Sequence, residues 1–189
     1  ISDYHHPVFF SSSQYTHYIE SRQLLRKLID RFIFGVQPLY LHHILRYNQS
    51  LKQKNCLLRK AQFPLHPGEL DSWNRVLAES GVRIVHERMD FVDRLNTVIS
   101  ETFDPSLRIG YSPSLESDQG FSSEAFLLKL RGLQDREIRS RQTLAGIQRD
   151  NFDFYVGDHR LSHFSSGEKK KYLLLVFFAY IELYRRQRR

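Results

Sequence analysis

The sequence predicts a mostly helical fold with a small antiparallel β element and a long antiparallel helical hairpin. Apolar residues recur at helical spacing along much of the 189-residue chain, which is typical of amphipathic helices. Two short runs, "FDFYV" (152–156) and "RLSHF" (160–164), flank Gly157-Asp158, a pair that favours a tight hairpin turn. Hydrophobic residues make up 41% of the chain, which is enough to build a core and argues against global disorder.

The first predicted helix precedes the hairpin. Leu24, Leu28 and Phe32 lie at helical spacing. We expect this helix to stop near Gly35, and Pro38 is suited to open the next one.

Two longer segments predict the hairpin itself. In each of them, apolar residues and a few asparagines are separated by alternating steps of three and four, which places a narrow seam on one side of a helix. The Pro/Gly-containing stretch 63–69 separates them and predicts a turn between antiparallel helices. The second helix is expected to cover roughly 30 residues, or about 45 Å. The seam residues are Leu41, Ile44, Asn48, Leu51, Asn55 and Leu58, and then Ala78, Val82, Val85, Met89, Val92, Asn96 and Ile99.

The remaining elements are shorter, apart from the last helix. Ser122 or Ser123 is suited to cap a helix that starts directly after it. The expected elements are strands at 8–10 and 107–112, a loop over 112–123, a helix over 124–137 and a helix over 166–188.

The charge of the chain points to an anionic partner. The formal net charge is +7, and nucleic acid is the commonest partner of a basic domain. Lys52, Lys54, Arg59 and Lys60 lie on the first hairpin helix and are candidate phosphate contacts. The competing interpretation is that they solvate the outer face of the hairpin.

Several kinds of site are disfavoured. Cys56 is the only cysteine, which excludes an intrachain disulfide and a thiolate metal cluster and fits a reducing compartment. His159 and His163 are four residues apart, but both are predicted to lie in a strand, so no metal site is expected. The apolar run 172–184 is shorter than the about 20 residues that a membrane span needs.

The stretch "FSSGEKKKYLLLVFF" (164–178) carries the most specific chemistry. A Ser-x-Gly-polar turn at the start of an apolar helix offers free backbone N–H groups and the positive end of the helix dipole, and both favour a phosphate. An ordinary serine cap is the alternative. The order of a hairpin, this turn and a long apolar helix resembles the signature segment of ABC/SMC-type ATPases. In those proteins the signature reaches the γ-phosphate of ATP held by the other subunit.

Four segments together resemble the RecF family of DNA replication and repair ATPases, in the family's order and spacing. They are "RKLIDRFIFGVQPLYL" (26–41), "YNQSLKQKNCLLRK" (47–60), "TLAGIQRDNFDFYV" (143–156) and "FSSGEKKKYLLLVFFAYIELYRR" (164–186).

The resemblance implies roles for individual residues. Ser165, Ser166, Gly167 and Glu168 fall on the ATP signature, which would act in trans. Gly146, Arg149 and Asp150 fall on the motif that precedes the signature, and Arg26 and Asp30 fall on an early motif.

The chain departs from the family pattern at three places, which indicates a divergent member or a paralogue. Leu25-Arg26 stands where the family usually has two arginines, Ile147-Gln148 stands for Pro-His, and Glu168 stands for Gln.

The resemblance implies an incomplete ABC/SMC-type ATPase head lobe with a helical arm. Residues 1–37 would end the N-lobe of the head, 38–140 would form the arm with a possible strand near 107–112, and 141–189 would hold the β-hairpin and the signature helix. The chain contains no G-x-x-x-x-G-K-[ST] loop and no apolar strand with paired acids after the signature. We therefore expect a fragment of a longer protein that cannot hydrolyse ATP alone. ATP and Mg would bind the intact parent, with none bound to the fragment.

The implied function is that of an ATP-dependent, cytoplasmic DNA-binding protein of recombinational DNA repair and replication restart. It would form an ATP-bound homodimer on gapped DNA or a single-strand/double-strand junction. It would work with RecR- and RecO-type mediators to support RecA loading, without contacting a membrane. The alternative is a stand-alone basic helical-hairpin module that binds nucleic acid or a protein partner. The flanking sequence would separate the two hypotheses.

Overall fold

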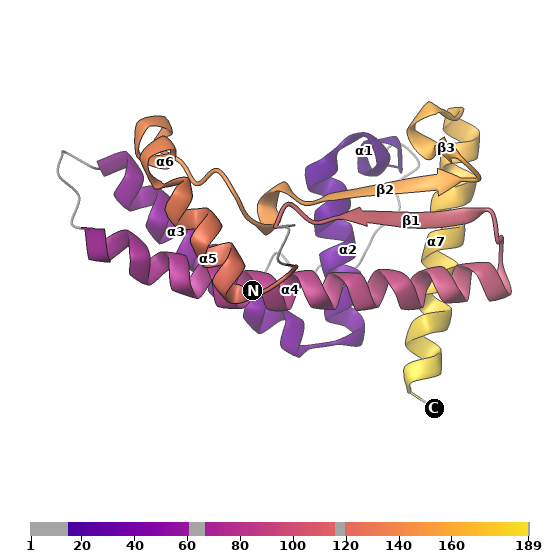
Figure 1. The fold of residues 1–189 in the computed structure, drawn as a ribbon. Coiled ribbons are helices and arrows are strands. Elements are labelled where there is room, and N and C mark those ends of the chain that lie inside the picture. Colours follow the sequence, from indigo (N-terminus) through magenta and orange to yellow (C-terminus); the bar gives the residue numbers. More distant parts are fainter. Residues whose placement is uncertain (1–14, 61–66, 116–119, 189) are drawn as a thin grey trace. The chain divides into compact units, whose positions relative to one another are not determined.

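A computed structural model describes residues 15–60, 67–115 and 120–188. The chain divides into two compact units, each made of segments that are distant in sequence (Figure 1). The first unit comprises 1–37, 88–112 and 151–189, and the second comprises 38–87 and 113–150. The predicted strand at 8–10 lies outside the described residues.

The first unit combines helices with a three-stranded antiparallel sheet of order β1-β2-β3. Its helices are α1 (Tyr15–Glu20), α2 (Arg22–Val36), the second part of α4 (Pro67–Thr102) and α7 (Ser166–Gln187). Its strands are β1 (Leu107–Ser112), β2 (Asn151–Val156) and β3 (His159–Arg160). The predicted strand at 107–112 and the hairpin turn at Gly157-Asp158 are confirmed. Of the run 160–164, however, only Arg160 belongs to a strand, because a 3-10 turn at Leu161–His163 follows directly.

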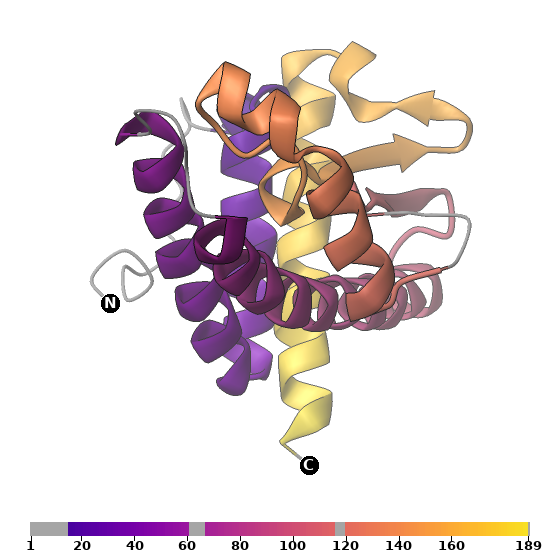
Figure 2. The same ribbon diagram turned by 60° about the vertical axis from the view of Figure 1, so that its left-hand side comes forward.

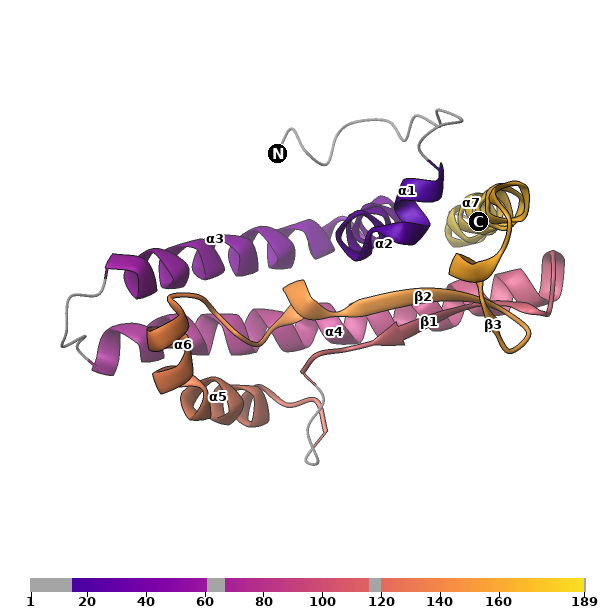
Figure 3. The same ribbon diagram turned by 90° about the horizontal axis from the view of Figure 1, so that it is seen from above.

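Alternation along the strands separates a buried from an open face of the sheet. Leu107 and Ile109 of β1 and Phe152 and Phe154 of β2 are buried, as expected of residues that share one face. Helices α2 and α7 lie on one side of the sheet (Figures 1 and 3). The outer edge of β1 is closed by Asn96 of α4, whose amide bonds both the N–H and the C=O of Ile109 at 2.8 and 2.9 Å. An edge strand is thereby kept from pairing with another chain.

Helix α7 packs on α2 through aromatic rings. Phe32 lies edge-on to Phe177, with ring centroids 5.0 Å apart, and stacks on Tyr180 at 4.2 Å. Gly35 makes room for Tyr180, because a Cβ at this position would collide with the tyrosine hydroxyl. Figure 2 shows α2 (indigo) and α7 (yellow) side by side. The ring contacts hold the middle of α7 against α2.

The second unit contains the helical hairpin. Helix α3 (Leu39–Lys60) runs antiparallel to the first part of α4, with Arg46 bonded to Glu79 at 3.2 Å and His43 3.8 Å from Glu87. Helices α5 (Ser123–Gly132) and α6 (Gln134–Ser140) complete the unit. The mostly helical class with a small antiparallel sheet and a hairpin is confirmed, although α4 is longer than expected, with 36 residues.

Details of the helices differ from the expectations. The predicted helix 124–137 is two helices, because the first ends at Gly132, and Ser122 is its N-cap. On α4, Met89 was expected in the seam but is 36% exposed, while Arg88 beside it is buried. On α3, Tyr47 and Lys54 are buried in place of the predicted Asn48 and Asn55. The buried face therefore differs from the face predicted by apolar spacing at positions where a polar side chain is buried by a partner from another element.

Among the described residues, no helix has both the length and the hydropathy required to cross a bilayer.

Candidate functional site

The predicted signature residues form an exposed turn at the start of α7. Ser165 is the N-cap residue, with φ −62° and ψ 158°, and the side chains of Ser165, Ser166 and Glu168 lie in solvent. The sequence Ser-x-x-Glu folds here into a reciprocal capping box. The first N–H groups of a helix lack an intrahelical acceptor, so this turn presents backbone donors and hydroxyls to solvent.

Glu168 engages the donors of Ser165. Its Oε2 accepts hydrogen bonds from the Ser165 N–H at 3.0 Å and from the Ser165 hydroxyl at 2.7 Å. The hydrogen bond from the Ser165 side chain, followed by the one from its backbone, lowers the pKa of Glu168. A carboxylate at the positive end of the helix competes with a phosphate for the same donors.

The motif before the signature, Gly146, Arg149 and Asp150, belongs to the second unit, where two of its residues stabilise the fold. Gly146 has φ +137°, a conformation that is essentially restricted to glycine, and a Cβ at this position would collide with the hydroxyl of Tyr47. Asp150 is fully buried and accepts a hydrogen bond from the N–H of Ser114 at 2.8 Å. The Ser114 hydroxyl in turn donates to the carbonyl oxygen of Gly146 at 2.6 Å. Gly146 and Asp150 therefore hold the residues after β1.

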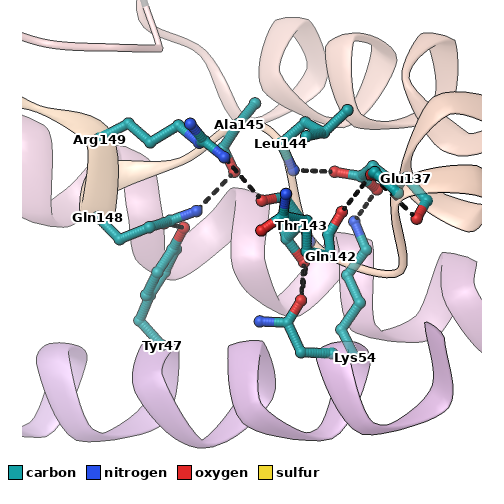
Figure 4. A network of polar contacts seen from close by, with 11 residues as sticks. Tyr47, Lys54, Glu137, Gln142, Thr143, Leu144, Ala145, Gln148 and Arg149 are labelled. Atoms are coloured by element: carbon teal, nitrogen blue, oxygen red, sulfur yellow. Dashed lines mark hydrogen bonds and ion pairs between the residues drawn. The ribbon is translucent and has the colours of Figure 1, made fainter. Parts of the chain in front are cut away.

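Gln148 and Arg149 follow Gly146 in the same motif, and their side chains point in different directions (Figure 4). Gln148 accepts a hydrogen bond from the Tyr47 hydroxyl at 2.7 Å. Arg149 is exposed, and its guanidinium lies 3.5 Å from the carbonyl oxygen of Thr143. Of the two charged residues of this motif, Asp150 is buried and Arg149 is exposed to solvent.

A buried network ties this motif to helix α3 (Figure 4). The Lys54 ammonium lies 2.6 Å from Oε2 of Glu137, and both side chains are buried. The other oxygen of Glu137 accepts a hydrogen bond from the N–H of Leu144 at 2.8 Å. Asn55 accepts hydrogen bonds from the N–H and the hydroxyl of Thr143 at 2.7 and 3.0 Å. The two adjacent residues of α3 thus fix the segment that leads into Gly146.

Lys54 must be removed from the predicted phosphate contacts. Burial lowers the pKa of its ammonium, while the Glu137 carboxylate opposes that shift. A buried, ion-paired ammonium does not reach a phosphate in solvent. Lys52, Arg59 and Lys60 are exposed on α3 and remain candidates.

The early motif, Arg26 and Asp30, also contributes to the fold through an ion pair of Asp30 with helix α4. Asp30 is buried and receives two hydrogen bonds from Arg88 of α4, each 3.0 Å long. The Arg88 guanidinium lies 5.7 Å from the ring centroid of Phe152, so the pair joins α2, α4 and β2. Arg26 is half-buried. The sequence analysis missed Arg88, because no local pattern connects it to an aspartate 58 positions away.

The described histidines His159 and His163 lie in different local structures. His159 lies in β3 as predicted, but His163 lies in the 3-10 turn. Within residues 15–60, 67–115 and 120–188, no cluster of histidine, cysteine and carboxylate side chains could hold a metal ion.

No family model matches the chain, but curated relatives do. The chain is 31% identical over 165 residues to "DNA replication and repair protein RecF" of Streptococcus pneumoniae (strain CGSP14), which covers 84% of this chain and 45% of that protein. It is 28% identical over 181 residues to the protein of the same name from Prosthecochloris aestuarii, covering 89% and 49%. The chain thus spans about half the length of the curated relatives that it matches.

Solved structures show the same fold. The structure of the recombination mediator protein RecF-ATP in the RecFOR pathway matches with a TM-score of 0.81 and 23% identity, covering 92% of this chain and 49% of that chain. The corresponding RecF-ATPrS structure matches with a TM-score of 0.83 and 22% identity, covering 94% and 51%.

Proposed function

Because this chain belongs to the RecF family, we propose that it is part of an ATP-dependent DNA-binding protein of recombinational DNA repair and replication restart. The observation that carries the proposal is the exposed Ser165–Glu168 turn at the start of α7. It supports the assignment because it combines hydroxyls, backbone donors and a helix N-terminus in a chain whose relatives bear the RecF name.

In this proposal the turn acts in trans. Ser165, Ser166 and Gly167 donate hydrogen bonds to the γ-phosphate of an ATP molecule held by a second subunit. ATP then joins two subunits into a homodimer on gapped DNA or at a single-strand/double-strand junction. ATP and Mg are held by parts of the protein outside this chain, which alone does not catalyse hydrolysis.

Glu168 opposes that contact. Its carboxylate must give up the Ser165 donors before a phosphate can take them, whereas an amide would carry no negative charge. We therefore expect this member of the family to need more ATP for dimerisation than a variant with Gln at this position.

The remaining partners follow from the proposed family role. Arg149, Lys52, Arg59 and Lys60 are exposed cations and are the proposed DNA contacts, with Lys54 excluded. RecR- and RecO-type mediators would be the protein partners. The complex would support RecA loading and would act in the cytoplasm.

The test is Ser165→Arg in the full protein that contains this chain. The bulky cation should abolish ATP-driven dimerisation, measured by light scattering, while nucleotide binding to the monomer is retained. Ser162→Arg, an exposed position in the preceding 3-10 turn, is the matched control and should dimerise normally. If the Ser165 variant still dimerises with ATP, the signature assignment is wrong.

A second function class is favoured by one observation, the exposed Lys52, Arg59 and Lys60 on the hairpin helix α3. They would suit a stand-alone hairpin module that binds nucleic acid or an acidic protein. DNA binding that is unaffected by ATP, by Ser165→Arg and by dimerisation of the full protein would favour this module over the ATPase.

A further inference from the structure

A row of three side chains crosses the open face of the sheet in the first unit. Arg108 of β1 lies directly opposite Tyr155 of β2, and Tyr155 lies directly opposite Arg160 of β3. Directly opposed residues in antiparallel strands point to the same face. Because Leu107 and Ile109 beside Arg108 are buried, this row occupies the other face.

The tyrosine ring holds the two guanidinium groups. The central guanidinium carbon of Arg108 lies 4.1 Å from the ring centroid of Tyr155, and that of Arg160 lies 6.0 Å from it. Both distances are within the range of a cation–π interaction. The ring itself lies over Gly110, where a Cβ would approach within 2.9 Å of the Tyr155 ring. A side chain at that position would displace the ring, so glycine permits this arrangement.

The row remains accessible and carries two guanidinium groups. Arg108 is exposed, and the side chain of Arg160 is 53% exposed. The nearby acid is Asp153, whose carboxylate lies 3.9 Å from Arg160, at the outer limit of an ion pair. Asp158 lies in the turn that joins β2 to β3, and within the described residues no ion pair joins it to Arg108 or Arg160. Within the first unit, the helices α2 and α7 lie on the opposite side of the sheet (Figures 1 and 3).

We infer that this face, defined by Arg108, Tyr155 and Arg160, is a contact surface for the phosphate backbone of DNA. The inference rests on the proposed DNA-binding function and deepens it by naming a surface distinct from helix α3. Guanidinium groups are well suited to phosphate oxygens, and the aromatic ring reduces the entropy lost when they bind.

The first experiment uses the full protein that contains this chain and a fluorescent single-stranded oligonucleotide in an anisotropy titration at several salt concentrations. The double variant R108A/R160A should bind at least several-fold more weakly. The slope of log K against log salt should become shallower by about 1.4, at roughly 0.7 for each lost contact with a single-strand phosphate. R22A/R139A removes the same charge from exposed positions elsewhere and should keep the wild-type slope. Circular dichroism checks that each variant is folded.

The second experiment separates the ring from the charge. Tyr155→Phe keeps the ring and should bind DNA as the wild type does. Tyr155→Ala removes the ring without changing the charge and should weaken binding, because the guanidinium groups lose their support. An effect of equal size in both variants would contradict this positioning role of the ring.

The outcomes distinguish the inference from the function on which it rests. If the wild-type protein fails to bind DNA, the proposed DNA contact of this chain fails, and this inference fails with it. If the wild type binds and R108A/R160A matches R22A/R139A, only the inference is overturned. Competition with inorganic phosphate tests the source of the phosphate group: displacement at the same phosphate concentration as unlabelled oligonucleotide would indicate a small-anion site and would also overturn it.

Discussion

Lys54 and Glu137 form a buried ion pair across the second unit, with 2.6 Å between the ammonium nitrogen and the carboxylate oxygen. Glu137 also binds the backbone of Leu144. The pair therefore connects the hairpin helix α3 to the segment that leads to Gly146 and Asp150 (Figure 4).

Removal of Lys54 alone should strongly destabilise the chain. Lys54→Met leaves the Glu137 carboxylate buried without its counter-ion, so the free energy of unfolding in urea should fall by about 3–5 kcal/mol. The double variant K54M/E137Q should recover most of the loss, because glutamine is neutral and can still accept from Leu144. Lys52→Met, at an exposed position on the same helix, is the control and should change the stability by less than about 0.5 kcal/mol. Equal stability of K54M and K52M would contradict the importance of the pair.

Gly146→Ala should destabilise the same unit for a backbone reason. The φ of +137° is strained for alanine, and the new Cβ would collide with the Tyr47 hydroxyl, so we expect a loss of about 1–3 kcal/mol or more. Tyr47→Phe removes the colliding oxygen, and the double variant should therefore lose less than the sum of the single losses. Gly132→Ala, where an added Cβ meets nothing within 4 Å, should leave the stability unchanged or slightly raised.

Ser165→Ala should weaken the start of α7 and change the acidity of Glu168. Loss of the cap should lower the free energy of unfolding by about 1 kcal/mol. The Ser165 side chain is the largest cause of the lowered pKa of Glu168, so this pKa should rise towards its ordinary value in an NMR titration. Because the folded-state pKa is depressed, the contribution of the capping box is present at neutral pH and is lost as the pH falls through that pKa. Ser166→Ala, outside the capping box, should leave the Glu168 titration unchanged.

Asp71 should make the second unit sensitive to acid. The hydrogen bonds from Arg131, at 2.7 and 3.0 Å, are the largest cause that lowers the pKa of Asp71 from 3.8 to about 2. Its stabilising contribution should be complete above pH 3.8 and should disappear as the pH falls towards 2. Arg131→Ala should raise the pKa of Asp71 and flatten the stability profile in that window. Arg75→Ala, which removes a smaller contribution, should flatten it less.

The early motif shows where sequence reasoning reached its limit. Asp30 was singled out by its place in the motif, but its role follows from Arg88, with which it shares two hydrogen bonds. Arg88 lies in a stretch of α4 where the apolar period predicted Met89 to be buried. Helical spacing reports which residues can share a face, but it does not report which polar side chain will be buried by a partner from another helix.

The sequence by itself determined the helical class, the hairpin of α3 and α4, the strand Leu107–Ser112 and the turn at Gly157. These depend on local periodicity, on turn chemistry and on breakers that act within a few residues. Only the tertiary structure decided that Lys54 is buried against Glu137 and that Asp150 holds Ser114. It alone brought Arg108, Tyr155 and Arg160 into one row. The physical reason is that these contacts, apart from that of Tyr155 with Arg160 across the hairpin, join residues far apart in the chain. Their energy depends on burial and geometry that arise only when the helices and strands have packed.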